Sequence, residues 1–283
     1  MSDTEAVDTA GNPQSQSGRH TPGDIPLQFG RSRPTAWFPQ RNANWVYWCA
    51  CQYLRIYYLL AARLRVEGLE NVPRKGGAVV VCNHGPGNDY FPVGVSLPRM
   101  PRIMAKVEIF NWHPIMRFIM TTGGAIPVDR GAGDVEALRT SIDAVRSGEL
   151  LLIFPEGHRS EDGKLQTAKT GATRIALDAN VPIIPVGVIN AEAGWNNFPR
   201  FWKRPIVLVR IGKPFVLEGK GGQDRAAVLA GTRRIMMAIA ELLPYAMRGV
   251  WAEPAQPTAR AGRDARARER AEAESGAPDV NLG

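Results

Sequence analysis

The sequence predicts an α/β fold with a mostly parallel, mixed central sheet flanked by helices. From about residue 77 onward, apolar runs rich in β-branched residues alternate with stretches of helical periodicity. Such alternation is typical of layer folds in which helices cover both faces of a largely parallel sheet. An aromatic-rich stretch precedes this region and predicts one further helix, which we place at a membrane interface.

Each expected element follows from its own pattern of apolar residues. Strands are expected over the β-branched runs at 78–82, 124–128, 150–154, 183–188 and 206–211. Helices are expected near 107–120, 133–147, 168–179 and 224–243. In open α/β sheets, ligands bind beyond the carboxyl ends of the strands. Polar residues that directly follow these strands are therefore the first candidates for a functional site.

Composition divides the chain into four parts. Residues 1–35 are rich in Gly, Pro, Ser, Thr and Gln, and residues 251–283 alternate Ala with Arg and Glu, so we expect a disordered N-terminal tail and a charged, disordered C-terminal tail. Between them lie a membrane-associating helical segment at 36–65 and the main folded domain at 66–250. The N-terminus lacks the basic and apolar regions of a secretory signal peptide.

Charge and cysteine content narrow the classes of partner. The formal net charge is +8, and both ends of the chain carry slightly more acidic than basic residues, so the positive excess lies in the body. A basic body favours an anionic partner such as a membrane surface or a phosphorylated substrate. We expect no nucleic-acid binding, because no recognised motif or dense Lys/Arg cluster is present. Three cysteines without framework spacing argue against a disulfide scaffold or a zinc site and favour a reducing, cytoplasmic setting.

The most hydrophobic stretch is 44–64, in which six Trp and Tyr residues surround Gln52 and Arg55. A spanning helix needs about 20 predominantly apolar residues, and a central Arg costs about 2.5–3.5 kcal/mol on insertion scales. Aromatic side chains with polar tips prefer the headgroup zone of the bilayer. We therefore favour a helix that lies in the membrane interface over a packed core helix or a true span.

A candidate acid–base pair follows the first apolar strand of the main domain. Val79–Val81 read as a buried strand that ends at Asn83-His84, and Gly85-Pro86-Gly87 predicts a turn before a helix capped by Asn88 or Asp89. Such a turn can fold the Asp89 carboxylate back onto the His84 imidazole. A carboxylate bound to one ring nitrogen fixes the tautomer and leaves the other nitrogen free to take a proton.

Four segments in order extend this pattern along the chain. They are Asn83-His84 with Asp89, the strand Gly124–Arg130, the charged turn Phe154–Ser160, and the proline-framed strand Val181–Val186. Over roughly residues 66–215 the chain resembles the glycerolipid acyltransferases with an H-x-x-x-x-D motif, whose best-known member is 1-acylglycerol-3-phosphate acyltransferase. The resemblance implies that 66–250 is an acyltransferase domain.

The resemblance also implies a mechanism. His84 would be the general base that removes the proton from an acceptor hydroxyl, and Asp89 would orient the imidazole and stabilise its positive charge. The acyl donor would be a thioester, acyl-CoA or acyl carrier protein, and the acceptor a lysophospholipid, most simply lysophosphatidic acid. No metal and no cofactor are expected beyond this co-substrate. Cys82 is expected to be a core residue rather than a nucleophile.

Five further residues are implied in acceptor or phosphate binding. Arg130 falls where the family's second motif binds the acceptor phosphate, and a guanidinium fork suits that group. Glu156, Gly157 and Arg159 fall in the third motif, and Gly157 would allow close backbone approach. Lys106 follows the apolar run 102–105 and is a further candidate phosphate ligand. The alternative is that Lys106 is an ordinary solvated lysine.

The motifs also depart from the family pattern. Pro86 stands where Ser is common, His158 replaces the usual Thr of the Glu-Gly-Thr-Arg signature, and Pro127 stands where an apolar or aromatic residue is common. These changes leave the acid–base pair intact, but they allow an acceptor other than the one typical of the family. The alternative hypotheses are the same chemistry on another lysophospholipid or a glycolipid, and a non-catalytic lipid-binding protein.

Two further segments mix aromatic with basic residues, namely 109–120 and 195–203. Such segments suit a surface that meets anionic lipid headgroups, and their alternative is the ordinary edge of a core. With the stretch 44–64, they predict a peripheral or monotopic protein on the cytoplasmic face of a membrane.

Overall fold

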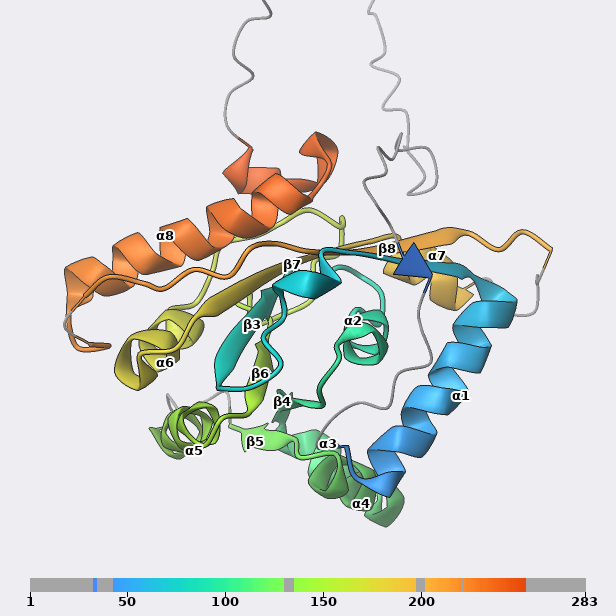
Figure 1. Ribbon diagram of the computed structural model, residues 1–283, viewed down its shortest axis with the longest axis horizontal. Helices are drawn as coiled ribbons and strands as arrows, with labels where there is room; N and C mark the ends of the chain where they lie inside the picture. The colour runs from blue at the N-terminus through green and yellow to red at the C-terminus, as the bar shows by residue number, and fades with distance from the viewer. Residues whose placement is uncertain (1–32, 35–42, 130–134, 197–201, 220, 253–283) are drawn as a thin grey trace, which may run out of the picture.

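The computed structural model describes residues 33–34, 43–129, 135–196, 202–219 and 221–252, and its centre is a single mixed sheet (Figure 1). The strand order is β1-β2-β8-β7-β3-β6-β4-β5. The strands are β1 (Arg33–Pro34), β2 (Arg63–Glu67), β3 (Ala78–Cys82), β4 (Pro101–Lys106), β5 (Ile126–Val128), β6 (Leu150–Ile153), β7 (Ile183–Ile189) and β8 (Ile206–Ile211).

The sheet is mostly parallel, as predicted. Strand β3 pairs in parallel with β6 and β7, β4 with β5 and β6, and β2 with β8. Only the pairs β1–β2 and β7–β8 among the described strands are antiparallel. The carboxyl ends of β3, β4, β5, β6 and β7 therefore meet at one edge of the sheet, where the polar segments of the sequence were expected.

Helices cover both faces of the sheet (Figure 1). They are α1 (Trp45–Ala61), α2 (Tyr90–Ser96), α3 (Val107–Trp112), α4 (Pro114–Thr122), α5 (Val135–Arg146), α6 (Gly171–Ala179), α7 (Ala191–Asn196) and α8 (Arg225–Leu242). Short 3₁₀ turns lie at Leu69–Asn71, Tyr245–Met247 and Gly249–Trp251. The predicted α/β layer architecture is confirmed.

Strand β3 divides the core into two halves because all five of its residues are buried. Val79 and Val81 face a cluster built with α5, α6 and α8, whereas Val80 and Cys82 face a cluster built with α1 and α2. A continuous apolar run of this kind is what a parallel strand covered on both faces requires. The Cys82 side chain is fully buried, so its predicted core role is confirmed.

The helical pattern expected near 107–120 forms two helices, α3 and α4. The structure breaks it at His113, whose backbone is extended (φ −156°, ψ 143°), and α4 starts at Pro114. A residue before proline is pushed out of the helical region by the proline ring. The His113 side chain then caps the new helix by accepting a hydrogen bond from the Ile115 N–H (3.2 Å).

The N-terminal helix α1 has one packed side and one exposed apolar side. Leu54 and Tyr58 are buried against the sheet, whereas Trp45 and Tyr53 are 71% and 68% exposed. Within the described part of the chain, no helix is both long and apolar enough to cross a membrane. The tails expected at 1–35 and 251–283 lie outside the described residues, apart from β1 and the last two residues of the folded part.

The buried side of α1 holds α2 in place. The Tyr47 hydroxyl donates to the Gly94 carbonyl (3.2 Å), and the Arg55 guanidinium donates to the Val95 carbonyl (3.5 Å). Arg55, which interrupts the apolar run in the sequence, is only 6% exposed. Its positive charge lies at the carboxyl end of α2, where unpaired carbonyls and the helix dipole favour a cation.

Candidate active site

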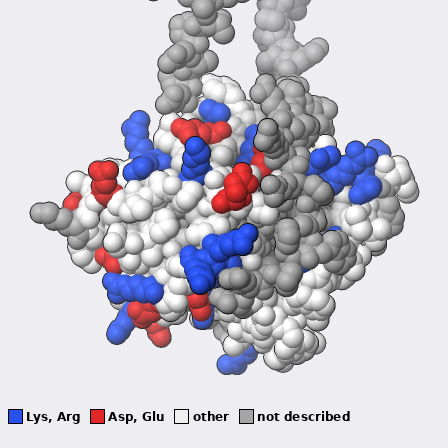
Figure 2. All heavy atoms as spheres, viewed as in Figure 1, with Lys and Arg blue, Asp and Glu red and all other residues white. Residues whose placement is uncertain are grey.

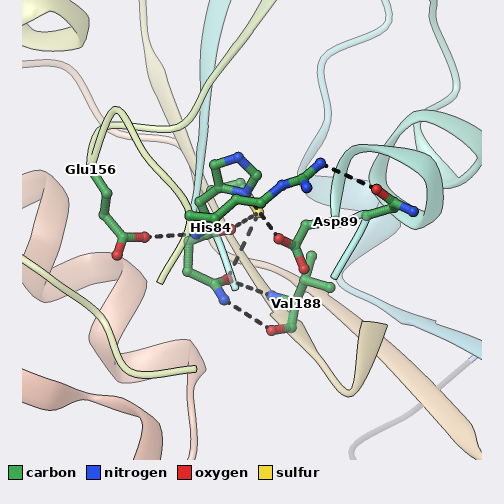
Figure 3. A network of polar contacts seen from close by, with 8 residues as sticks. His84, Asp89, Glu156 and Val188 are labelled. Carbon is green, nitrogen blue, oxygen red and sulfur yellow. Dashed lines mark hydrogen bonds and ion pairs between the residues drawn. The ribbon is translucent and has the colours of Figure 1, made fainter. Parts of the chain in front are cut away.

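The His84–Asp89 pair and Glu156 lie where β3 and β6 end (Figure 3). Asn83 is the first residue after β3. Its side-chain amide nitrogen donates to the Val188 carbonyl (3.0 Å), and its amide oxygen accepts from the Val188 N–H (2.7 Å). One side chain thereby replaces the pair of backbone hydrogen bonds that another strand residue would make. The main chain of β3 is free to turn away from β7 at this point.

The turn brings the two predicted acid–base residues together. His84 Nδ1 lies 3.0 Å from Asp89 Oδ2. The carboxylate accepts from Nδ1–H, so the neutral imidazole presents an unprotonated Nε2, and no hydrogen bond from the described residues reaches Nε2. The Asp89 side chain is 3% exposed and that of His84 is 13% exposed. The carboxylate is thus shielded while the imidazole reaches solvent.

Backbone geometry explains one of the two glycines of the turn, Gly87. A Cβ on Gly87 would lie 2.6 Å from the Glu192 nitrogen at the start of α7, so only glycine fits. The sequence predicts that Asn88 or Asp89 caps α2. Asp89 does stand at the N-cap position, directly before Tyr90, but its side chain makes no capping hydrogen bond. The carboxylate is directed at His84 instead.

The environment of Asp89 shifts its acidity. Burial raises the pKa of the Asp89 carboxyl above its ordinary value, and hydrogen bonds from His84 and the Gly85 main chain lower it in part. The ring of His84 also stacks on Phe154 at the end of β6, with 4.2 Å between ring centroids and 25° between planes. The carboxylate and the phenyl ring together hold the imidazole in one orientation.

Glu156 supports His84 from the main-chain side. Its Oε1 accepts from the His84 N–H (2.6 Å), and its Oε2 accepts from the Gln166 N–H (2.9 Å). Glu156 is 1% exposed, and this burial raises the pKa of its carboxyl while the two backbone hydrogen bonds oppose the rise. Glu156 therefore fixes the backbone of the base, and a direct contact with an acceptor stays a prediction.

The third motif forms a loop pressed against this turn. The Ser160 N–H donates to the His84 carbonyl (2.8 Å), and the Arg159 guanidinium donates to the Asn88 side chain (3.3 Å). Gly157 has φ +75°, a left-handed conformation that favours glycine. Gly157 and the exposed Arg159 thus lie near His84, as their proposed role requires.

One further predicted phosphate ligand, Lys106, lies along the same sheet edge. Lys106 is the last residue of β4, is exposed, and pairs in register with Val128 of β5. Strand β6 lies between β3 and β4, so Lys106 ends a strand two positions in the sheet from β3, which His84 follows. Arg130 lies outside the described residues, and its role in phosphate binding stays a prediction.

Several residues of the site were not predicted from the sequence. In the sequence Asn83 is only the neighbour of the motif histidine, and no pattern distinguishes Phe154, Gln166 or Lys169 as a site residue. Asn83 and Phe154 contact residues about 70 to 105 positions away in the sequence, and Gln166 and Lys169 contact other parts of their own loop. A local sequence pattern therefore cannot predict these contacts. An Asn at the end of an otherwise apolar strand was the one available signal, because a buried amide needs partners.

A metal site is not formed by the residues that the structure describes. Among them, no three His, Cys, Asp or Glu side chains come together in an arrangement that could hold a metal ion. His113 and His158, which the acid–base pair does not use, make local hydrogen bonds instead. The His158 ring nitrogens contact the Glu156 carbonyl (3.0 Å) and the Gln166 side chain (2.5 Å), which closes the third-motif loop.

Comparison with known proteins identifies the relatives of this chain. A family model described as Acyltransferase matches residues 63–189. The chain is 32% identical over 163 residues to the 1-acyl-sn-glycerol-3-phosphate acyltransferase of Bacillus subtilis, which covers 57% of this chain and 78% of that protein. It is 27% identical over 189 residues to the human 1-acyl-sn-glycerol-3-phosphate acyltransferase alpha, covering 66% of each chain.

Coverage differs widely among the relatives. The chain spans only 35% of the chloroplastic Arabidopsis thaliana enzyme LPAT1, with 32% identity over 127 residues. Among solved structures, the 1-acyl-sn-glycerophosphate (LPA) acyltransferase of Thermotoga maritima has the same fold, with a TM-score of 0.51, 23% identity, and coverage of 67% of this chain and 78% of that one.

The matched segment begins at β2 and ends at β7, so it contains the His84–Asp89 pair and the third motif. The similarity to the Bacillus protein extends over most of that protein's length. The chain is therefore an acyltransferase enzyme and belongs to the family of the 1-acyl-sn-glycerol-3-phosphate acyltransferases.

Proposed function

We propose that this enzyme transfers a fatty acyl group from acyl-CoA or acyl carrier protein to the free hydroxyl of lysophosphatidic acid, giving phosphatidic acid. The observation that carries the proposal is the 3.0 Å contact between His84 Nδ1 and Asp89 Oδ2, which leaves Nε2 available as a base. The names of the relatives in Bacillus and human supply the acceptor.

The chemistry needs one base and no covalent enzyme intermediate. Nε2 of His84 takes the proton of the acceptor hydroxyl as its oxygen attacks the thioester carbonyl. The new C–O ester bond forms, the C–S bond breaks, and the thiolate that leaves takes the proton from the imidazolium. Asp89 stabilises that imidazolium, and general base catalysis contributes roughly 10²–10⁴ in rate. The thioester is already activated, so no cofactor has to supply further chemistry.

Basic residues at the same sheet edge would hold the acceptor phosphate. Arg159 lies on the loop that hydrogen-bonds to His84, and Lys106 ends β4, the strand beyond β6. A guanidinium binds two phosphate oxygens at once, which also orients the glycerol carrying the reactive hydroxyl. We assign Arg130, Arg159 and Lys106 to this phosphate, with Gly157 allowing close backbone approach and Glu156 fixing the loop.

The enzyme would act as a peripheral or monotopic protein on the cytoplasmic, anionic face of a membrane, where both its lipid acceptor and its product reside. Helix α1 exposes Trp48 and Leu59, and α4 exposes Ile115 and Phe118 (each 48–61% exposed). The two helices are joined, because the Asn44 side chain that caps α1 donates to the Thr122 carbonyl at the end of α4. Their exposed apolar side chains would enter the headgroup layer.

The first test is an assay of the purified protein in lipid or detergent with labelled long-chain acyl-CoA and lysophosphatidic acid. We expect phosphatidic acid from the wild type, a loss of at least about 10²-fold in kcat for His84→Ala, and a raised KM for lysophosphatidic acid in Arg130→Ala. Arg233→Ala, which removes an exposed arginine of α8, is the matched control and should resemble the wild type.

Other results separate the alternatives. Activity only with acyl carrier protein, or only with another lysophospholipid or a glycolipid, would keep the chemistry and correct the substrate. An His84→Ala variant as active as the wild type would overturn the mechanism. A protein that binds lipid but transfers no acyl group from any donor would favour the lipid-binding alternative.

A further inference from the structure

A lysine that no motif assigned lies across the third-motif loop. If Gly157 carried a Cβ, that atom would lie 2.8 Å from Cε, 2.9 Å from Cδ and 3.3 Å from Nζ of Lys169. The Lys169 side chain therefore passes directly over the Gly157 backbone. The Lys169 N–H donates to the Pro155 carbonyl (2.8 Å), so both the main chain and the side chain of Lys169 are held against this loop.

The loop is fixed to the proposed base on both sides of Gly157. Glu156 accepts from the His84 N–H (2.6 Å), and the Ser160 N–H donates to the His84 carbonyl (2.8 Å). Lys169 is thus joined to His84 through a short series of hydrogen bonds and a van der Waals contact. Its ammonium group lies next to Gly157, two positions before Arg159 in the third motif.

The ammonium group of Lys169 has no counter-charge in the part of the chain that the structure describes. It makes no hydrogen bond or ion pair there, and the side chain is exposed. Lys164, four residues into the same loop from Ser160, differs in this respect because its ammonium lies 3.6 Å from an Asp162 oxygen. An unpaired ammonium held next to a reactive site is suited to an anionic substrate group.

We propose that Lys169 binds a phosphate group of a substrate. The phosphate of the lysophospholipid acceptor is the favoured source, because Lys169 lies against Gly157 of the third motif, which the proposed function assigns to acceptor binding. The inference rests on the proposed function and adds a residue to it. Gly157 then has a second role: the absence of a side chain, at φ +75°, lets the lysine stem lie on the loop and carries its charge toward the acceptor.

Steady-state kinetics with lysophosphatidic acid and acyl-CoA varied separately test the proposal. Lys169→Met keeps the aliphatic stem and removes the charge. We expect the KM for lysophosphatidic acid to rise about tenfold or more, which is the size of a lost charge-assisted hydrogen bond, with kcat and the KM for acyl-CoA nearly unchanged. Lys169→Arg should retain most of the acceptor affinity. Lys164→Met is the matched control, with the same change of charge on the same loop, and should leave both KM values unchanged.

A second variant tests the contact with Gly157. Gly157→Ala places a methyl group where the lysine stem lies, so it should raise the KM for lysophosphatidic acid in the wild-type background. In the Lys169→Met background, the same substitution should raise it much less. Equal effects in both backgrounds would mean that Gly157 acts independently of the lysine and would count against the proposal.

Kinetic and binding results together separate this inference from the proposed function. A rise in the KM for acyl-CoA instead would keep the phosphate role and assign it to the donor, whereas an unchanged KM for both substrates in Lys169→Met would overturn it in an active enzyme. If the wild type transfers no acyl group, equilibrium binding still tests the role of Lys169. Lysophosphatidic acid and a monoacylglycerol with the same acyl chain are then each titrated into wild type and Lys169→Met. Lys169→Met should weaken only the first, and equal binding by wild type and variant would overturn the inference.

Discussion

Two buried carboxylates flank His84, and they act on different parts of it. Asp89 binds the imidazole, whereas Glu156 binds the main-chain N–H of the same residue. Burial raises the pKa of both carboxyls. An ionised group in such a place costs free energy unless hydrogen bonds compensate for lost hydration. The site is therefore held together partly at the expense of folding stability.

Glu156 gives a prediction for stability against pH. Because its folded-state pKa is raised above the ordinary 4.5, the folded protein binds more protons than the unfolded chain from about pH 4.5 up to the raised value, and stability from this group falls as pH rises. Urea unfolding from pH 4.5 to 7 should show the free energy of unfolding of wild type relative to Glu156→Gln decreasing, by at most about 1.4 kcal/mol per pH unit. A difference that grows with pH would show that the two amide hydrogen bonds outweigh burial.

The sequence predicted the acid–base pair but not its surroundings. His84 and Asp89 could be paired because a glycine-rich turn separates them by only five positions. The partners of Glu156 could not be predicted, since a carboxylate that binds two backbone N–H groups leaves no trace in the identity of the donors. Lys169 escaped for a related reason: its significance depends on a contact with a residue that has no side chain.

At the scale of elements, α6 and α8 are joined by a buried polar contact. The hydroxyl groups of Thr173 and Thr232 lie 2.7 Å apart, and Thr232 also donates to the Val228 carbonyl (2.8 Å). Both residues are at most 9% exposed. A buried hydroxyl that loses its partner costs about 1–3 kcal/mol, whereas replacing both partners by groups of the same shape can be nearly neutral.

A double-mutant cycle on this pair should show strong coupling. We expect Thr232→Val to lower the free energy of unfolding by about 1–3 kcal/mol, because Thr173 is left without its partner. Thr173→Val with Thr232→Val should cost less than the sum of the two single changes, as measured by urea unfolding. Strict additivity would mean that the hydroxyl contact contributes nothing to the packing of α6 on α8.

The predicted elements match the structure best where the apolar pattern is strongest. The runs that became β3, β7 and β8 and the periodicities that became α5, α6 and α8 are all found within a few residues of their expected bounds. Strands β2 and β4 are not among the predicted strands, because charged residues interrupt Arg63–Glu67 and the apolar part of Pro101–Lys106 is only Ile103–Ala105. Neither reads as a buried run, and both are identified only through their neighbours in the sheet.

At the scale of the whole molecule, the exposed apolar side chains are concentrated on a few helices. On the face shown in Figure 2, Lys and Arg side chains lie scattered among acidic ones rather than in one continuous stripe. Most of the exposed large aromatic and aliphatic residues of the described chain, in contrast, lie on α1, α3 and α4, which lie side by side (Figure 1). Hydrophobic insertion, assisted by general positive charge, would therefore dominate membrane association.

Vesicle cosedimentation with matched variants tests that view. Phe118→Glu on α4 should reduce binding to vesicles that contain anionic phospholipid, because the carboxylate cannot enter the apolar layer. Leu229→Glu on α8 is the control, since the two side chains are almost equally exposed (55% and 57%). Equal losses for both variants would mean that the surface of α1 and α4 has no special part in binding.

The general architecture could be predicted because it depends on patterns repeated along the chain, whereas the arrangement of α1 could not. Its sequence is apolar on almost every side, so periodicity alone did not tell which side meets the sheet. The structure resolves this through Tyr47 and Arg55, whose polar ends bind carbonyl groups of α2. Arg55, which in the sequence argues against a membrane-spanning helix, is buried in the structure and binds α2.

The amide of Asn83 has a consequence for how the enzyme can vary. A sheet is ordinarily held by main-chain groups common to nearly all residues, so its register is insensitive to single substitutions. Here the last hydrogen bonds between β3 and β7 are made by a side chain, so they depend on which residue stands at position 83. An Asp of the same shape has no amide N–H to donate, so one change at this position would loosen the attachment of His84 and leave every reacting group in the protein unaltered.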